Sequence, residues 1–133
     1  MKLNRSTGYA LLAIGHIAKN QGDGVVRSED IAKQCNISLE YLLKILQQLV
    51  QANVLRSKRG PQGGFRLAKP TNKITMLEII EAVDGPLTGE LNLTKQARND
   101  RYGAKVQQTY SKAISGARSV LQKTKLSSLL GGE

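Results

Sequence analysis

Two amphipathic helical segments lie so close together in this sequence that only two or three residues can join them. Glu29 to Cys35 is predicted to form a short helix, with Ser28 as its N-cap and Asn36 as its end. Ser38 is the predicted N-cap of the next helix. Helices joined this tightly must cross at an angle, which is the arrangement of a helix-turn-helix.

The second of these helices divides into two faces. Its apolar residues recur three and four positions apart and form one stripe, which consists of Leu42, Ile45, Leu46, Leu49 and Val50. The other side carries Glu40, Tyr41, Lys44, Gln47, Gln48 and Gln51. A helix-turn-helix needs this division, because one face packs on the core and the other remains available to a partner.

A glycine-rich hairpin is predicted directly after this helix. Residues 54–59 and 65–69 alternate in polarity and flank a tip, residues 60–64, that holds three glycines and one proline. Basic side chains crowd both arms: Arg56, Lys58, Arg59 and Arg66. Like charges opposite one another in a hairpin repel, so this crowding favours an anionic partner.

The glycines have two other interpretations. A nucleotide-binding P-loop would end in Lys-Ser or Lys-Thr and open a helix, whereas Phe-Arg-Leu follows Gly64 here and no helix begins. The glycines can also simply turn the hairpin. The basic arms favour a third interpretation, in which the hairpin is a wing that lies along a phosphate backbone.

The remaining segments complete a mainly α-helical fold with one small β-hairpin. A helix is expected over residues 5–20, and Thr75 with Glu78 forms a capping box for a helix that stops at Gly85-Pro86. Residues 87–103 are expected to form a loop with a short helix inside it. A long periodic helix follows from residue 104 to about residue 125. The predicted organisation is a winged helix-turn-helix domain (1–85), a connecting loop or short helix (86–103) and a long C-terminal helix with its tail (104–133).

The net charge limits the class of partner. Lys and Arg number 20 and Asp and Glu 10, a net charge of +10 that favours a polyanion such as nucleic acid or an anionic membrane surface. Residues 1–72 hold 11 basic and 4 acidic side chains, so most of the excess lies in the N-terminal half of the chain. No stretch has signal-peptide character and the apolar run at residues 9–14 is too short to span a bilayer, so a cytoplasmic location is expected.

Four stretches of the chain resemble the Rrf-type family of bacterial winged-helix regulators. They are Y-A-L-L-A-I at 9–14, I-S-L-E-Y-L-L-K-I-L at 37–46, R-G-P-Q-G-G-F-R-L-A at 59–68 and I-T-M-L-E-I-I-E-A-V-D-G at 74–85. The family includes iron-sulfur cluster assembly regulators, nitric-oxide-sensitive repressors and cysteine-metabolism repressors. The resemblance covers about residues 1–85, and the final helix by position only.

This resemblance implies a homodimer on double-stranded DNA with a partly palindromic operator, in which the C-terminal helices cross between subunits. The residues expected at the major groove are Ser38, Leu39, Glu40, Tyr41 and Lys44, with Ser28 supporting the helix-turn-helix, and those expected in the wing are Lys58, Arg59, Gly60, Gly63, Gly64 and Arg66. The expected dimer interface consists of Val106, Tyr110, Ala113, Ile114, Ala117, Val120 and Leu121. Glu40 can accept a hydrogen bond from cytosine or favour the helix dipole, and the sequence leaves both roles open.

The chain departs from the family at a cofactor site. Many members carry three cysteines between the fourth helix and the dimer helix, where these ligate an iron-sulfur cluster, whereas residues 85–110 contain none here. We therefore expect no cluster and no metal. Cys35 is expected to be a small buried side chain rather than a redox group, and His16 a packing residue rather than a lone metal ligand.

The predicted function is a homodimeric, nucleoid-associated transcriptional repressor that occludes its operator. The sequence leaves the signal open between a small molecule, a protein partner and none. No nucleophile, base and orienting group converge in any motif, so catalysis is not expected. The alternative is a basic RNA-binding or ribosome-associated module, against which one Phe and four Tyr offer few platforms for base stacking.

Overall fold

The computed structural model describes residues 4–131, so the ends of the predicted ranges 1–85 and 104–133 lie outside the described residues. Three helices come first: α1 (Arg5–Asn20), α2 (Ser28–Cys35) and α3 (Leu39–Gln51). A hairpin of β1 (Leu55–Lys58) and β2 (Gly64–Leu67) and a 3-10 turn, η1 (Thr71–Lys73), follow. The chain continues through α4 (Met76–Asp84), α5 (Lys95–Asn99), α6 (Arg101–Lys123) and α7 (Leu126–Leu129).

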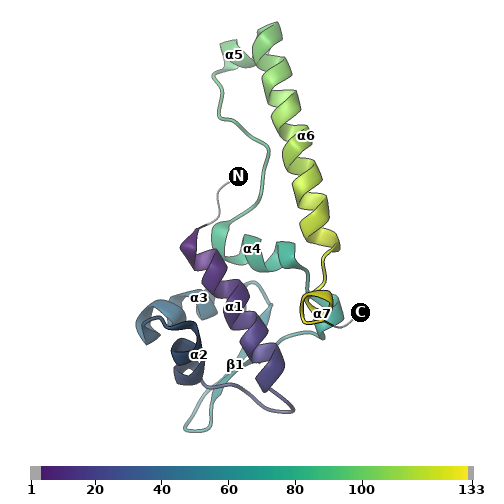
Figure 1. The fold of residues 1–133 in the computed structure, drawn as a ribbon. Coiled ribbons are helices and arrows are strands. Elements are labelled where there is room, and N and C mark those ends of the chain that lie inside the picture. The colour runs from purple at the N-terminus through teal and green to yellow at the C-terminus, as the bar shows by residue number, and fades with distance from the viewer. Residues whose placement is uncertain (1–3, 132–133) are drawn as a thin grey trace.

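The predicted fold class, mainly α with a small β-hairpin and a long C-terminal helix, is confirmed. Figure 1 shows two parts: a packed body that contains α1 to α4 and the hairpin, and α6, which extends away from it as a rod with α5 beside its far end. Within residues 4–131, no helix combines the length and the apolar character that a membrane span requires.

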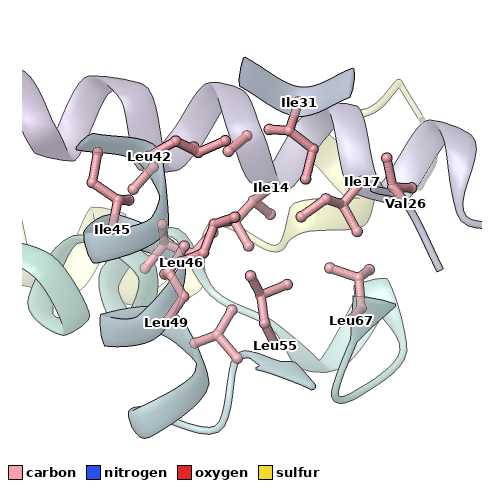
Figure 2. Close-up of a cluster of buried hydrophobic side chains, with 14 of the residues drawn as sticks. Ile14, Ile17, Val26, Ile31, Leu42, Ile45, Leu46, Leu49, Leu55 and Leu67 are labelled. Carbon is pink, nitrogen blue, oxygen red and sulfur yellow. The ribbon is translucent and has the colours of Figure 1, made fainter. Parts of the chain in front are cut away.

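The core of the body lies where α1, α2, α3 and the hairpin meet. Ile14 and Ile17 from α1, and Leu42 and Leu46 from α3, are fully buried there (Figure 2). The stripe predicted on α3 is therefore the packed face, with Val50 half-buried at its end. Burying each such side chain contributes about 1.5–3 kcal/mol, so this cluster fixes the crossing of α2 and α3.

The turn between α2 and α3 depends on two residues. Asn36 adopts the left-handed conformation, with φ 57°, which Asn tolerates better than most residues and which ends α2. The side chain of Ser38 accepts a hydrogen bond from the backbone N–H of Tyr41, which confirms the predicted N-cap of α3.

The predicted N-cap of α2 is wrong by one residue. Ser28 is the first helical residue and Arg27 holds the cap position, without a side-chain cap hydrogen bond. The hydroxyl of Ser28 donates instead to the carboxylate of Glu29, so it is not the acceptor for the first turn of backbone N–H groups.

The hairpin has a simple register and one unexpected neighbour. Leu55 lies opposite Leu67, and both are buried against the helices. The strands are shorter than predicted, because pairing runs only from Leu55 opposite Leu67 to Lys58 opposite Gly64. An isolated antiparallel bridge between Val26 and Phe65 joins the loop before α2 to β2, which the sequence pattern did not reveal.

The predicted capping box of α4 is present, with Thr75 and Glu78 hydrogen-bonded to each other's backbone N–H groups.

The base of α6 is joined to the body from two sides. Arg118 of α6 donates to Glu81 of α4 at 2.6 Å. The chain then folds back through α7, whose Leu126 is buried in the core of the body.

Candidate nucleic-acid interface

The face of α3 turned away from the core is open to solvent. Its exposed residues are Ser38, Leu39, Glu40, Leu43, Lys44, Gln47, Gln48 and Gln51. They form a continuous surface because residues three and four positions apart lie next to each other on a helix. Four of the five residues predicted to meet the major groove belong to this surface, and Tyr41 does not.

Tyr41 points toward α1 and is half-buried. Its hydroxyl lies 2.7 Å from the hydroxyl of Ser6, and its ring packs edge-to-face on Tyr9 with centroids 5.8 Å apart. These contacts hold the start of α3 against α1. The structure thus gives Tyr41 a role in positioning the helix, and it leaves Lys44, one turn further on, exposed.

The wing tip presents Lys58, Arg59 and Gly60 to solvent. Two of its glycines are explained by contacts inside the chain. A Cβ on Gly64 would lie 2.3 Å from the carbonyl oxygen of Val26, and one on Gly63 would lie 2.1 Å from that of Lys58. Gly60 has φ +106°, a backbone conformation that side chains disfavour. These glycines therefore shape the wing, whatever they contact outside it.

Arg66 is committed to the chain itself. Its guanidinium donates to the backbone carbonyls of Asp23 and Gly24, at 3.1 and 3.2 Å, and so ties β2 to the loop between α1 and α2. Arg66 lies directly opposite Arg56 in the hairpin register. The internal hydrogen bonds hold the charge of Arg66 toward that loop, which makes Arg56, Lys58 and Arg59 the exposed cations of the wing.

A polar cleft of about 350 Å³ joins the wing to the helix-turn-helix. It is lined by Arg27 and Glu29 at the start of α2, by Gln47 of α3 and by Lys58 and Arg59 of the wing. Arg27 donates to Glu29 at 3.1 Å. Hydrogen bonds from the backbone N–H of Glu29 itself, from Ser28 and from Arg27 lower the pKa of Glu29, so one carboxylate remains ionised among these cations.

Two residues of this surface, Arg27 and Leu43, escaped the sequence analysis, and the contact of a third, Gln47, with the cleft was not foreseen. Arg27 lies in a loop outside any motif, and only the Val26–Phe65 bridge brings it beside the wing. Gln47 was placed on the outer face of α3, but its neighbour across the cleft was not foreseen. Leu43 is apolar and lies next to a core stripe, yet it is 41% exposed. Helical periodicity places Leu43 one turn after Leu39 on the outer face of α3, so its exposure could have been predicted from the sequence.

The predicted dimer residues occupy α6 unevenly. Ala113 and Val120 are exposed and Val106, Tyr110, Ala117 and Leu121 half-buried, whereas Ile114 is only 6% exposed. Ile114 is thus largely buried within its own chain, and its place in a dimer interface stays a prediction. Nothing in the described chain lies within 4 Å of a Cβ placed on Gly116, so its small size has no explanation inside one subunit.

The segment between α4 and α5 runs along α6, and hydrogen bonds hold it there. The side chain of Gln107 accepts from the backbone N–H of Leu91 at 3.1 Å and donates to the carbonyl of Gly89, which also accepts from Ser111. The helix α6 begins three residues earlier than predicted, because Asp100 caps it by accepting from Tyr102 and Gly103.

The chemistry of a metal or cluster site is not supported by the side chains present. Among residues 4–131, no three His, Cys, Asp or Glu side chains are grouped so that they could hold a metal ion. Cys35 and His16 both line a hollow of about 680 Å³ between α1, α2, α4 and α7. Burial raises the pKa of the Cys35 thiol, which disfavours the thiolate that binds iron.

Comparison with known proteins gives consistent matches. A family model, Rrf2, described as "Iron-dependent Transcriptional regulator", matches residues 3–132. The chain is 40% identical over 100 residues to BadM of Rhodopseudomonas palustris, which covers 75% of this chain and 62% of BadM. It is 37% identical over 86 residues to the HTH-type transcriptional regulator IscR of Cereibacter sphaeroides, which covers 63% of this chain and 56% of IscR. The chain thus spans little more than half of the length of these relatives.

The fold also matches a solved structure. That structure is CymR of B. subtilis, described as the global cysteine regulator, with a TM-score of 0.83 and 24% identity over 98% of this chain and 97% of CymR. The likeness extends over α6 as well as the winged-helix body, because nearly all of both chains is aligned.

Proposed function

This chain belongs to the Rrf2 family of transcriptional regulators, and on that premise we propose that it represses transcription as a homodimer bound to a partly palindromic operator. The exposed face of α3 and the cleft beside the wing carry this proposal, because they form one surface with a high density of cations. A helix of this kind fits the major groove, and cations on a flanking wing fit the phosphate backbone or the minor groove.

We infer the homodimer from apolar residues that α6 leaves exposed or half-buried. Val106, Ala113, Ala117 and Val120 recur at helical spacing on one side of α6. On the adjacent side, Ile114 is buried within the chain and Arg118 pairs with Glu81 of α4. A second copy covers this stripe by packing the same stripe against it around a two-fold axis. The two copies of α3, which we call the reading helices, then face two half-sites of DNA, and the bound dimer occludes the operator.

A signal would act through the joint between α6 and the body. Arg118 and Glu81 connect α6 to α4, and Glu81 also accepts from the backbone N–H of Leu87 at the start of the connecting segment. A small molecule or a protein that shifts the two α6 helices against each other would change the distance between the reading helices. We propose that such an effector binds at the segment over residues 87–100, which lies along α6.

We further propose that the chain works without an iron-sulfur cluster, unlike the iron-dependent members that give the family model its description. Clusters are held chiefly by thiolates, and Cys35 is the single cysteine of the sequence. It lies at the end of α2, far along the chain from the segment over residues 87–100. Iron and sulfide added to the purified protein should leave no visible absorption band after desalting.

A competition experiment tests the function. The purified protein should bind a pool of duplex DNA in preference to single-stranded RNA, and log K should fall steeply with log salt. Stronger competition by single-stranded RNA would support a basic RNA-binding module instead. As a regulator of chromosomal genes, the protein is expected in the cytoplasm, on the nucleoid.

Two variants locate the contact surface. Arg59→Ala should weaken binding to all duplexes and reduce the salt slope by about one unit, and Lys44→Ala should cost about 1–3 kcal/mol and relax the sequence preference. Lys112→Ala removes an equally exposed cation from α6 and is the control. If both variants bind like the wild type, the contact surface lies elsewhere.

A further inference from the structure

Two large apolar side chains lie on the face of α3 that we assign to DNA. Leu39 is 39% and Leu43 41% exposed, whereas Leu42 and Leu46 of the same helix are fully buried. Residues four positions apart share one side of a helix, so Leu39 and Leu43 form a short apolar strip. The strip is about 6 Å long, since each residue advances a helix by about 1.5 Å.

The surroundings of this strip are polar and basic. Lys44 follows Leu43 on the exposed surface, and Gln47, one turn beyond Leu43, lines the cleft that it shares with Lys58 and Arg59. Single exposed leucines are ordinary on a protein surface. Here two of them lie side by side in the first two turns of α3, the part of such a helix that contacts bases. This placement favours contact with an apolar group of the nucleic acid.

Duplex DNA offers such a group in the major groove. Base edges there present hydrogen-bond donors and acceptors, and the 5-methyl of thymine is the apolar exception. A leucine cannot read a donor or an acceptor, but it can exclude water from a methyl group that it touches. The cations around the strip favour this polyanionic occupant over an apolar protein surface.

We propose that Leu43 and Leu39 read thymine methyl groups in each half-site, and thereby set part of the sequence preference. This inference rests on the proposed function and deepens it. Base pairs are stacked about 3.4 Å apart, so a strip of about 6 Å matches methyl groups roughly two steps apart. The half-site should therefore contain two thymines at that separation, on the same strand or on opposite strands.

Deoxyuridine is the probe, because it lacks the methyl group of thymidine and keeps its hydrogen-bonding groups. High-affinity duplexes are first selected from random sequences with the wild-type protein. Each thymine of the selected half-site is then replaced by deoxyuridine, one at a time, and the dissociation constant is measured. Loss of one methyl contact should weaken binding about fourfold, the value expected for one buried methyl group at about 0.8 kcal/mol.

The leucine variants assign each methyl group to a residue. Leu43→Ala should bind the thymine and uracil duplexes equally at one position, and Leu39→Ala should do so at the other. Both residues are exposed, so both variants should unfold at the wild-type denaturant concentration. Leu12→Ala is the matched control, because Leu12 is 62% exposed on α1 and should leave the uracil effect intact.

The results separate this inference from the function on which it rests. A wild-type protein that ignores every duplex overturns the proposed function. A wild-type protein that binds a preferred duplex, but binds its uracil versions equally well at every position, overturns the thymine contact alone. Retention of the full uracil effect by the double variant Leu39→Ala/Leu43→Ala has the same consequence.

Discussion

The winged-helix body and α6 differ in how completely a single chain buries their apolar residues. In the body, most apolar residues of α1, α3 and the hairpin are buried within the chain, and Leu12, Leu39 and Leu43 are the exposed exceptions. In α6, which is 23 residues long, only Gly103 and Ile114 are buried, while Val120 is 65% exposed. Both parts are amphipathic helices by sequence. The difference shows that the body is a complete unit, whereas α6 has a second apolar side that a single chain does not cover.

The two ends of α6 also differ. Its base is fixed to the body by the Arg118–Glu81 pair and by the return of the chain through α7. Its far end contacts α5 and the segment held by Gln107. The contact with α5 is close, because a Cβ on Gly103 would lie only 1.8 Å from the carbonyl oxygen of Ala97. Figure 1 shows this end well away from the body.

The largest expected effect is a cavity in the body. Leu46→Ala should lower the free energy of unfolding by about 2–5 kcal/mol, because Leu46 is fully buried where α3 meets α1. Urea unfolding measures the loss. Leu43→Ala, one turn away on the exposed side, is the control and should cost less than about 0.5 kcal/mol. Equal losses for both would mean that α3 is packed differently.

The wing should respond next. Gly64→Ala should destabilise the body by about 1–3 kcal/mol, because its Cβ would press on the carbonyl of Val26 and break the bridge to Phe65. Gly8→Ala is the contrasting substitution, since nothing in the described chain lies within 4 Å of its Cβ, and it should stabilise α1 by about 1 kcal/mol. If Gly64→Ala left the stability of the body unchanged, DNA contact rather than packing would explain why glycine occupies this position.

The exposed side of α6 should affect association rather than folding. Val120→Glu should raise the dissociation constant of the dimer about tenfold, from roughly 1.5 kcal/mol of lost burial. Gln108→Glu adds the same charge on the opposite side of α6 and should leave the dimer intact. Sedimentation over a range of protein concentrations distinguishes the two. Dissociation by both variants would point to net charge instead of the apolar stripe.

Gly116 gives an independent test of the same side. Gly116→Leu should favour the helical conformation of α6 by up to about 1 kcal/mol, while it prevents close approach of a second α6. Helix content and dimerisation should therefore change in opposite directions. An intact dimer in sedimentation would show that no second helix approaches at Gly116.

The smallest effect is expected at the carboxylate in the cleft. Glu29→Gln should strengthen DNA binding modestly, because it removes a negative charge beside Arg27, Lys58 and Arg59. Since the folded protein lowers the pKa of Glu29 below its ordinary value of 4.5, the carboxylate stays charged as pH falls to that value. Its small contribution to stability is present above the ordinary pKa and is lost only below it, as pH falls through the lowered pKa.

Binding assays at pH 7 and pH 5 measure this prediction. The difference in affinity between Glu29→Gln and the wild type should be the same at both values, because Glu29 is ionised at both. Glu90→Gln is the control, because Glu90 is an exposed carboxylate between α4 and α5, outside the proposed DNA surface. A wild-type affinity that approaches that of Glu29→Gln at pH 5 would show that the carboxylate titrates in the ordinary range.

The sequence predicted the features that depend on neighbouring residues in the chain. Helical periodicity gave the bounds of α1 and the buried face of α3, and the side-chain chemistry of Ser38, Thr75 and Glu78 gave two helix starts. These signals are local because a cap or a stripe involves residues within one or two turns. Ser28 shows the limit, since its hydroxyl had an alternative partner in Glu29.

The tertiary structure decided which exposed groups remain available to a partner. Tyr41 and Arg66 had the right chemistry for DNA, but Ser6, Tyr9 and the carbonyls of Asp23 and Gly24 engage them. Arg27 gained its place in the cleft from a bridge to Phe65, 39 positions after Val26 in the sequence. Such contacts depend on how distant segments pack, and no local pattern encodes them. The sequence by itself determined the elements and the charge, and packing determined which of these charges DNA can reach.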